Sequence, residues 1–233
     1  MEYRNLGDSG LKVSMAGLGC NNFGMRLDES ETKIVVDAAI DAGITLFDTA
    51  DVYGQTKSEE FLGRALGARR HDVVIATKFG YDFANRPKEK LAGHQEAPQQ
   101  WDVPFIEQSL NGALERLGTD YIDLYQIHGH DPVTDIAETL RALTDLVRAG
   151  KVRYIGCSNL TAWQLMKSLG ISRQHGLAEF TSTQSYYSIA GRELEREMLP
   201  LVEDQGLAVL PWSPLAGGFL TGKFTRDHET DPN

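Results

Sequence analysis

The chain has 233 residues, a formal net charge of -10 at neutral pH and a sequence pI of about 5.1. This length suffices for one sizeable core, so we expect a single domain over residues 1–233. The acidic balance excludes a nucleic-acid partner, because no basic stripe can displace the counterions of a phosphate backbone.

Targeting and redox signals point to a soluble protein. No apolar run approaches membrane-spanning length, and the start Met1-Glu2-Tyr3-Arg4 does not resemble a secretory leader, so no membrane partner is expected. Cys20 and Cys157 each end an apolar stretch, which predicts two buried, reduced thiols and a cytoplasmic protein. The sequence has no Cys/His cluster with metal-ligand spacing, so no metal site is predicted.

In chain order, the first predicted element is a hairpin. Residues 3–14 alternate in polarity and break at Asp8-Ser9-Gly10, and this hairpin is expected to plug or cover one end of the main fold. Apolar strands then follow at 16–19, 45–47, 73–77, 121–127, 152–157, 180–183 and 207–211. Helices are expected between them at 28–43, 61–66, 105–117 and 133–149, then a short one carrying Leu165, Met166 and Leu169, and one carrying Leu194, Met198, Leu201 and Val202.

The alternation of strand and helix predicts the fold class. The strands start about every 30 residues, except for one longer step that contains the polar loop 79–104. Repeated units of this kind imply parallel strands joined by right-handed crossovers. We therefore expect an α/β fold, a (β/α)8 TIM barrel with an N-terminal β-hairpin, of which this chain holds about seven strand-helix units. One to two further units are expected to be missing beyond residue 233, and the long loop is expected to lie over the functional face.

Polar or aromatic residues stand where the later strands end, and in a parallel barrel these ends meet on one face. The residues are Asp48, Lys78, His128, Ser158 with Asn159, Gln184, and Trp212 with Ser213. Each has an ordinary alternative. Asp48 can cap its turn with Tyr53 packed on it, Lys78 can be a solvated lysine, and His128 a satisfied loop histidine. Their coincidence on one face favours an active site.

The residue types favour proton donation by a phenol to a carbonyl oxygen. Tyr53 is a poor acid by itself, and a neighbouring cation such as Lys78 favours the phenolate. Asp48 would keep Lys78 charged and oriented, and His128 could hydrogen-bond the substrate carbonyl. With no metal site predicted, the hydride would come from an organic cofactor.

At this point the sequence resembles the aldo-keto reductase family over essentially its whole length. The resemblance rests on Gly17-Leu18-Gly19, Asp48-Thr49-Ala50 with Tyr53-Gly54, Lys78-Phe79-Gly80, 121–128 (YIDLYQIH), Gly156-Cys157-Ser158-Asn159, Gln184-Ser185-Tyr186-Tyr187 and 212–218 (WSPLAGG). The long loop and Trp212 are most similar to the branch of aryl-alcohol and sugar dehydrogenases and potassium-channel beta subunits.

The resemblance implies a reductase of aldehydes or ketones, or a dehydrogenase of the corresponding alcohols or sugars. Tyr53 would be the proton donor, with Asp48, Lys78 and His128 as its partners. By analogy the resemblance implies NADPH, with NADH as the alternative. Relatives bind the 2′-phosphate with a basic segment after their eighth strand, and this sequence stops before that strand, so the preference is carried over from the family. The implied nicotinamide contacts are Ser158, Asn159, Gln184 and a stacking Trp212, and those of the pyrophosphate are Ser213, Pro214, Leu215, Ala216, Gly217 and Lys223. The carbonyl or sugar substrate is expected to meet Phe23, Tyr53, His128 and Trp101.

Two other readings stay open. A nicotinamide-binding regulatory subunit would sense redox state with little turnover. A barrel aldolase would use Lys78 as a Schiff-base nucleophile, which needs a lowered lysine pKa that Asp48 would oppose.

Overall fold

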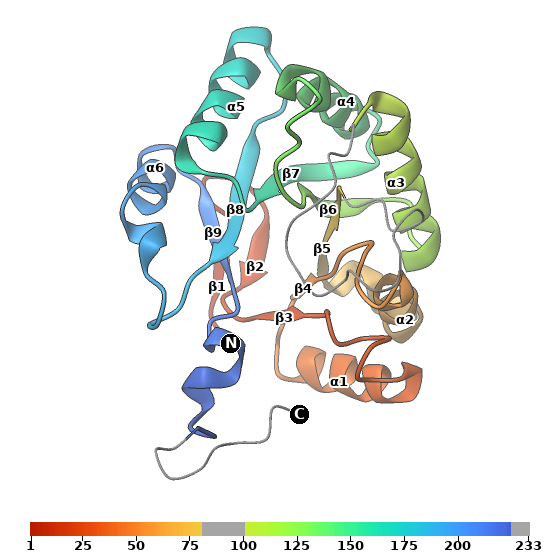
Figure 1. Ribbon diagram of the computed structural model, residues 1–233. Coiled ribbons are helices and arrows are strands. Elements are labelled where there is room, and N and C mark those ends of the chain that lie inside the picture. The colour runs from red at the N-terminus through yellow and green to blue at the C-terminus, as the bar shows by residue number, and fades with distance from the viewer. Residues whose placement is uncertain (81–100, 225–233) are drawn as a thin grey trace.

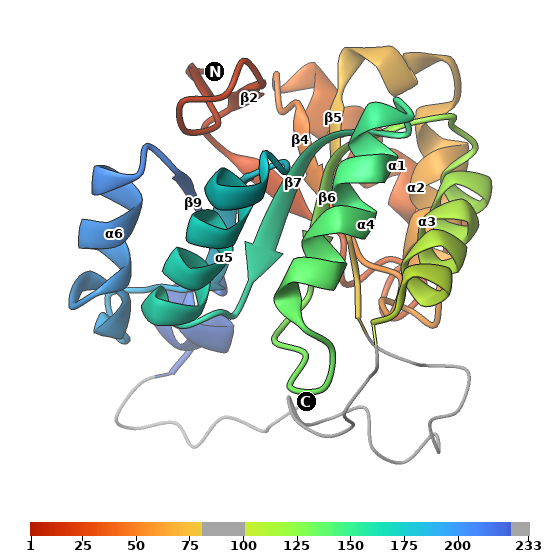
Figure 2. The same cartoon turned by 90° about the horizontal axis from the view of Figure 1, so that it is seen from above.

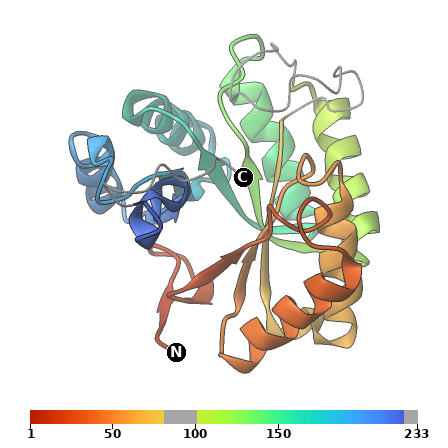
Figure 3. The ribbon, with the colours of Figure 1, turned by 60° about the horizontal axis from the view of Figure 1, so that its bottom comes forward.

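The computed structural model describes residues 1–80 and 101–224, so most of the predicted loop 79–104 lies outside the described residues. One parallel sheet organises the fold. Its strands lie in the order β3 (Gly17–Gly19), β4 (Leu46–Asp48), β5 (Val74–Phe79), β6 (Ile122–Ile127), β7 (Val152–Ser158), β8 (Phe180–Tyr186) and β9 (Ala208–Trp212). Figures 1 and 3 show the sheet curling, with helices along its outer face. Within the described residues β3 and β9 are its edges, so the predicted seven-stranded part of a (β/α)8 barrel is confirmed.

Within residues 1–80 and 101–224, six α-helices connect the strands in turn. They are α1 (Glu29–Asp41), α2 (Lys57–Leu66), α3 (Val103–Leu117), α4 (Ile136–Arg148), α5 (Ala162–His175) and α6 (Met198–Asp204). Helix α1 begins with a capping box: the Glu31 backbone N–H donates to Asp28 Oδ1 and the Asp28 N–H to Glu31 Oε2, each at 2.9 Å. Among the described residues, none of the helices is long and apolar enough to cross a membrane.

Several predicted boundaries were wrong, and side-chain caps explain two of them. Helix α3 begins earlier than expected because Asp102 caps it, and α4 begins later than expected because Asp135 accepts a hydrogen bond from the Ala137 N–H. Helix α5 is a full 14 residues long. The predicted helix around Leu194 is divided into the 3-10 turn Glu193–Glu195 and α6.

The N-terminal hairpin closes the amino end of the sheet, as predicted. Its strands β1 (Tyr3–Asn5) and β2 (Lys12–Ser14) pair antiparallel, and Figure 2 shows it beyond the starts of the long strands. The hairpin and the inner face of the sheet form one apolar cluster, whose members are Leu6, Leu11, Val13, Leu46, Val74, Ala76 and Leu124. The barrel interior is therefore apolar at this end, which leaves the polar residues to the opposite end.

Candidate active site

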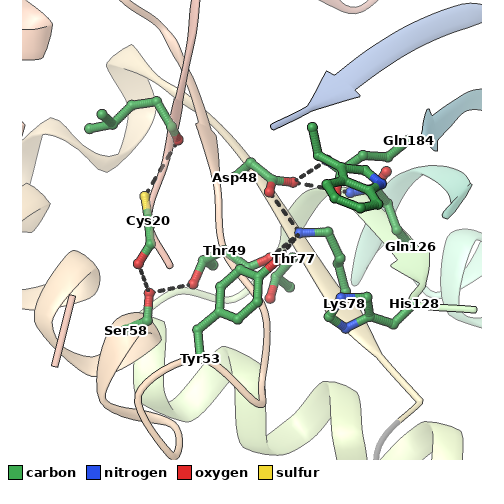
Figure 4. A network of polar contacts seen from close by, with 12 residues as sticks. Cys20, Asp48, Thr49, Tyr53, Ser58, Thr77, Lys78, Gln126, His128 and Gln184 are labelled. Carbon is green, nitrogen blue, oxygen red and sulfur yellow. Dashed lines mark hydrogen bonds and ion pairs between the residues drawn. The ribbon is translucent and has the colours of Figure 1, made fainter. Parts of the chain in front are cut away.

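An ion pair lies at the carboxyl ends of β4 and β5 (Figure 4). Lys78 Nζ donates to Asp48 Oδ2 at 2.7 Å and to the Thr49 carbonyl oxygen at 2.8 Å. The Lys78 side chain has no exposed surface, whereas 19% of the Asp48 side chain is exposed. Burial alone would lower the pKa of Lys78, but Asp48 and Tyr53 together hold it above its ordinary value. Lys78 is therefore a permanent cation at neutral pH.

Tyr53 reaches this pair from the loop after β4. Its hydroxyl lies 3.5 Å from Lys78 Nζ, and the ammonium lies 5.0 Å from the centroid of its ring. Gly54 turns the loop with a positive φ of 58°, and a Cβ there would stand 2.6 Å from the Phe23 carbonyl oxygen. Burial raises the pKa of Tyr53 and the charge of Lys78 lowers it, with a net rise. We expected the cation to dominate, but desolvation outweighs it and keeps the phenol protonated.

His128 completes the group of four. It follows β6, is 8% exposed, and its ring meets the Tyr53 ring edge to face at 5.8 Å between centroids and 82° between planes. Its backbone N–H donates to the Phe79 carbonyl at 2.9 Å, so β5 fixes where the residue stands. The structure thus brings together all four side chains that the sequence assigned to catalysis.

Sequence reasoning missed two contributors to this group. Gln126 donates from Nε2 to Asp48 Oδ1 at 3.3 Å, and Thr49 supplies the second acceptor for Lys78. A signal for Gln126 was present: it precedes His128 by two residues, and strand alternation places such residues on one face. Thr49 acts through its backbone, for which residue type gives no signal.

The predicted nicotinamide residues lie on the neighbouring strands. Ser158 and Gln184 are register partners in β7 and β8, and Trp212 is the last residue of β9, where its indole N–H donates to Asn159 Oδ1 at 3.0 Å. Ser158 Oγ is buried with no hydrogen-bond partner within residues 1–80 and 101–224. Gln184 Nε2 donates to Asp48 Oδ1 at 2.8 Å. Amides and a buried free hydroxyl suit a primary carboxamide, which both donates and accepts, so these residues fit a nicotinamide.

The segment after β9 is a turn of left-handed residues. Ser213, Ala216, Gly217 and Gly218 have φ values of 54°, 50°, 64° and 96°. Successive N–H groups in such turns can bind an anion, but the Ala216 and Gly218 N–H groups donate to the Ser213 and Leu215 carbonyls at 2.8 and 3.0 Å. Lys223 Nζ lies against Gly218, 2.9 Å from where a Cβ would be. Pro214, Leu215 and Gly217 are exposed here, as contact with a bound pyrophosphate requires.

The two aromatic residues expected at the substrate are buried. Phe23 and Trp101 are 2% and 3% exposed and belong to the main hydrophobic core. The Trp101 indole N–H donates to the Gly80 carbonyl at 3.2 Å, and its ring packs on Phe79. Their contact with a substrate stays a prediction, as does any ligand role of the residues above.

Two further sequence predictions concern cysteine and metal. Cys20 and Cys157 are free and buried, as predicted, and burial raises the pKa of the Cys157 thiol to about 12. Among the described residues, no group of three or more His, Cys, Asp or Glu side chains could hold a metal ion.

Comparison with known proteins identifies the family. Residues 16–233 match the model of the aldo/keto reductase family. The chain is 41% identical to versiconal hemiacetal acetate reductase of Aspergillus parasiticus, over 94% of this chain and 69% of that protein. It is 38% identical to a putative aryl-alcohol dehydrogenase of Schizosaccharomyces pombe (98% and 71% covered) and 36% identical to a probable voltage-gated potassium channel subunit beta of Oryza sativa (97% and 67% covered). These relatives confirm the branch that the sequence motifs indicated, and the chain belongs to the aldo/keto reductase family of oxidoreductases.

Proposed function

We propose that the protein reduces aldehydes or ketones, or oxidises the corresponding alcohols or sugars, with a nicotinamide cofactor, NADPH in preference to NADH. One observation carries the proposal: the Tyr53 hydroxyl lies 3.5 Å from the buried Lys78 ammonium, which Asp48 holds at 2.7 Å. A protonated phenol beside a fixed cation is suited to give its proton to a carbonyl oxygen. The reductase and dehydrogenase names of the relatives agree with it.

The chain's own residues divide the work. Tyr53 keeps its proton until a substrate oxygen with developing negative charge needs it, and Lys78 then stabilises the phenolate that remains. Asp48 fixes Lys78 and keeps it charged. His128, edge to face with Tyr53, is placed to hydrogen-bond the same substrate oxygen and so fix its orientation.

The proposed cofactor site is built from β7, β8, β9 and the turn after them. Ser158, Asn159 and Gln184 would hold the carboxamide, Trp212 would stack on the ring, and the turn from Ser213 to Lys223 would hold the pyrophosphate. When bound there, a reduced nicotinamide would supply the hydride.

Tyr53→Phe tests the proposal directly, because it keeps the ring and removes the hydroxyl. We expect kcat to fall by about 10² to 10⁴, the usual worth of a positioned general acid, while NADPH still quenches tryptophan fluorescence with wild-type affinity. A variant that reduces carbonyls at nearly the wild-type rate would show that another group is the acid.

A second candidate function is a regulatory subunit that binds the cofactor with little turnover, and the similarity to a potassium channel subunit beta favours considering it. Saturable NADPH binding by the wild type, without reduction of any aldehyde, ketone or sugar in a broad panel, would support it. The aldolase alternative needs a neutral Lys78, which the raised pKa of this lysine opposes. Borohydride trapping of an adduct on Lys78 with a carbonyl substrate would revive it.

A further inference from the structure

Asp48 Oδ1 is held by two amides, although one good donor suffices to orient a carboxylate oxygen. Gln184 Nε2 donates to it at 2.8 Å and Gln126 Nε2 at 3.3 Å. Oδ2 is occupied by Lys78. Figure 4 shows the two glutamines reaching Asp48 from the same side of the barrel. Two side chains on one oxygen raise the question of what each is for.

The surroundings of the two glutamines differ. Gln126 is completely buried in β6, paired with Lys78 on one side and Gly156 on the other. A Cβ at position 156 would stand 3.2 Å from Gln126 Cγ and 3.3 Å from Oε1, so this glycine leaves the room that the glutamine fills. Gln126 therefore lies in the closely packed interior of the sheet.

Gln184 is placed to do something else. It is 7% exposed, it is the register partner of Ser158, and its backbone carbonyl accepts from the Asn159 N–H at 2.9 Å. It thus stands beside the buried Ser158 hydroxyl, which has no hydrogen-bond partner among the residues that the structure describes. If its amide turns toward a ligand there, its bond to Asp48 lengthens and Gln126 remains as the amide on Oδ1.

We propose that Gln126 is the positioning residue for the Asp48–Lys78 ion pair, and that it frees Gln184 to bind the carboxamide of the nicotinamide. The inference rests on the proposed function. By fixing the Asp48 carboxylate, Gln126 fixes where Lys78 Nζ stands relative to the Tyr53 hydroxyl. A carboxylate that loses this donor can rotate, and small displacements of catalytic groups reduce turnover strongly.

Matched substitutions separate the two glutamines. Gln126→Met keeps the side-chain length without the donor, and we expect kcat to fall about tenfold or more while the Kd for NADPH, from tryptophan quenching, stays within about twofold. Gln184→Met should do the reverse, with the Kd raised about tenfold and kcat less affected. The inference is overturned if Gln126→Met has wild-type kcat, or if it weakens NADPH binding as much as Gln184→Met does.

Gln126→Glu gives a signature that mere loss of packing would not give. The charged or titratable groups around the new carboxyl are Asp48 on β4, Lys78 on β5, Tyr53 on the loop and His128 after β6. The Asp48 charge raises the pKa of a second carboxyl group beside it. While protonated, that group can donate to Asp48 Oδ1, and once ionised it repels it.

We therefore expect the kcat of Gln126→Glu to approach the wild-type value at low pH and to fall with a step, absent from the wild type, as pH rises. A kcat that is reduced equally at every pH would assign Gln126 to packing and overturn the inference. A wild type that binds NADPH without turnover would overturn the proposed function, and with it this inference. An active wild type whose Gln126→Met variant keeps full kcat would overturn the inference alone, so the two failures can be told apart.

Discussion

Two buried ion clusters of this protein invite comparison. In the first, Lys78 and Asp48 meet at the carboxyl end of the sheet. In the second, Asp123 of β6 forms ion pairs with Arg70 at 2.8 Å and with Arg153 at 3.0 Å, and the two guanidiniums lie over the Tyr121 ring at 4.2 and 4.0 Å. The Asp123 carboxylate also receives the Ile75 backbone N–H. Both clusters include a carboxylate on a strand of the sheet. They differ in the type of cation and in the groups that surround it.

The difference lies in the cation and in its neighbours. Arginine is always charged, and each oxygen of Asp123 contacts a different guanidinium, so the Asp123 cluster is a fixed structural joint. Lys78 is a point charge, and it stands beside the Tyr53 phenol, whose ring meets the ring of His128. A buried ion pair is therefore not a functional signal by itself. The Tyr53 hydroxyl lies within 3.5 Å of the Lys78 ammonium, whereas the Arg70 and Arg153 guanidiniums lie over the face of the Tyr121 ring.

The largest effect that would sharpen this contrast is on Lys78→Met. Removing the cation leaves the Tyr53 phenolate unsupported, so we expect kcat to fall by about 10² to 10⁴. Asp48 keeps its two amide donors, and the fold should survive. Steady-state kinetics beside a urea unfolding curve measure both. Retained turnover would mean that the ion pair is only structural, like the one at Asp123.

Arg70→Met should show the opposite pattern. Removing one partner of a buried ion pair typically lowers the free energy of unfolding by about 3 to 5 kcal/mol, because the buried carboxylate loses a positive charge that compensates its own. Arg153, half-exposed, keeps part of the compensation, so we expect the lower end of that range. Urea denaturation gives the loss, and kcat per folded molecule should equal that of the wild type. A stable but inactive variant would contradict the structural assignment of this cluster.

These two clusters also show what could be predicted from sequence. Asp48, Lys78 and His128 were found because each follows an apolar strand, and in a parallel sheet such positions converge. Arg70 and Asp123 lie 53 positions apart, and neither alternation nor helical period relates them. The same holds for Glu59, which is fully buried between Arg116 and Thr77. Long-range pairs of this kind depend on how helices dock, which local patterns do not encode.

The element types were predictable for the same reason, and their limits were not. Strand and helix types follow from hydrophobic periodicity, and all seven strands of the described parallel sheet were predicted at the right places in the chain. Several strands end later than predicted, because the backbone pairing between strands continues into polar residues. Lys78 pairs with Gln126, and Ser158 with Gln184. Composition signalled loop there, whereas backbone pairing with the adjacent strand kept these residues in the sheet.

A smaller effect is expected for His128→Gln. The amide can still donate a hydrogen bond to a substrate oxygen, so only the quality of orientation is lost. One hydrogen bond is worth about 0.5 to 1.5 kcal/mol, which corresponds to a loss of at most about tenfold in kcat/KM. Kinetics on one aldehyde substrate suffice. A loss as large as that of Tyr53→Phe would instead make His128 the acid.

A further contrast concerns Asp51, a buried carboxyl group on the loop between Asp48 and Tyr53. It is 3% exposed and its Oδ1 has no hydrogen-bond partner among the described residues. Burial, and next the neighbouring Glu59 carboxylate, raise the pKa of Asp51 well above its ordinary value. Unlike Asp48 and Asp123, Asp51 has no ion-pair partner in the structure's described part, so the fold favours its protonated form.

The sign of the resulting pH dependence follows from linkage. Because the folded-state pKa lies above the unfolded value, the stability that Asp51 contributes is full below the unfolded pKa of about 3.9 and is lost as pH rises through the folded pKa. Asparagine does not titrate. Asp51→Asn should therefore gain stability relative to the wild type between pH 5 and pH 8, by about 1.4 kcal/mol for each unit of pKa shift expressed in that window. Urea unfolding at the two pH values measures the gain, with Asp120→Asn on the exposed surface as the control. A gain that is equal at both pH values would mean that Asp51 is ionised in the folded protein, and would place it with Asp48 and Asp123 as a third charged site.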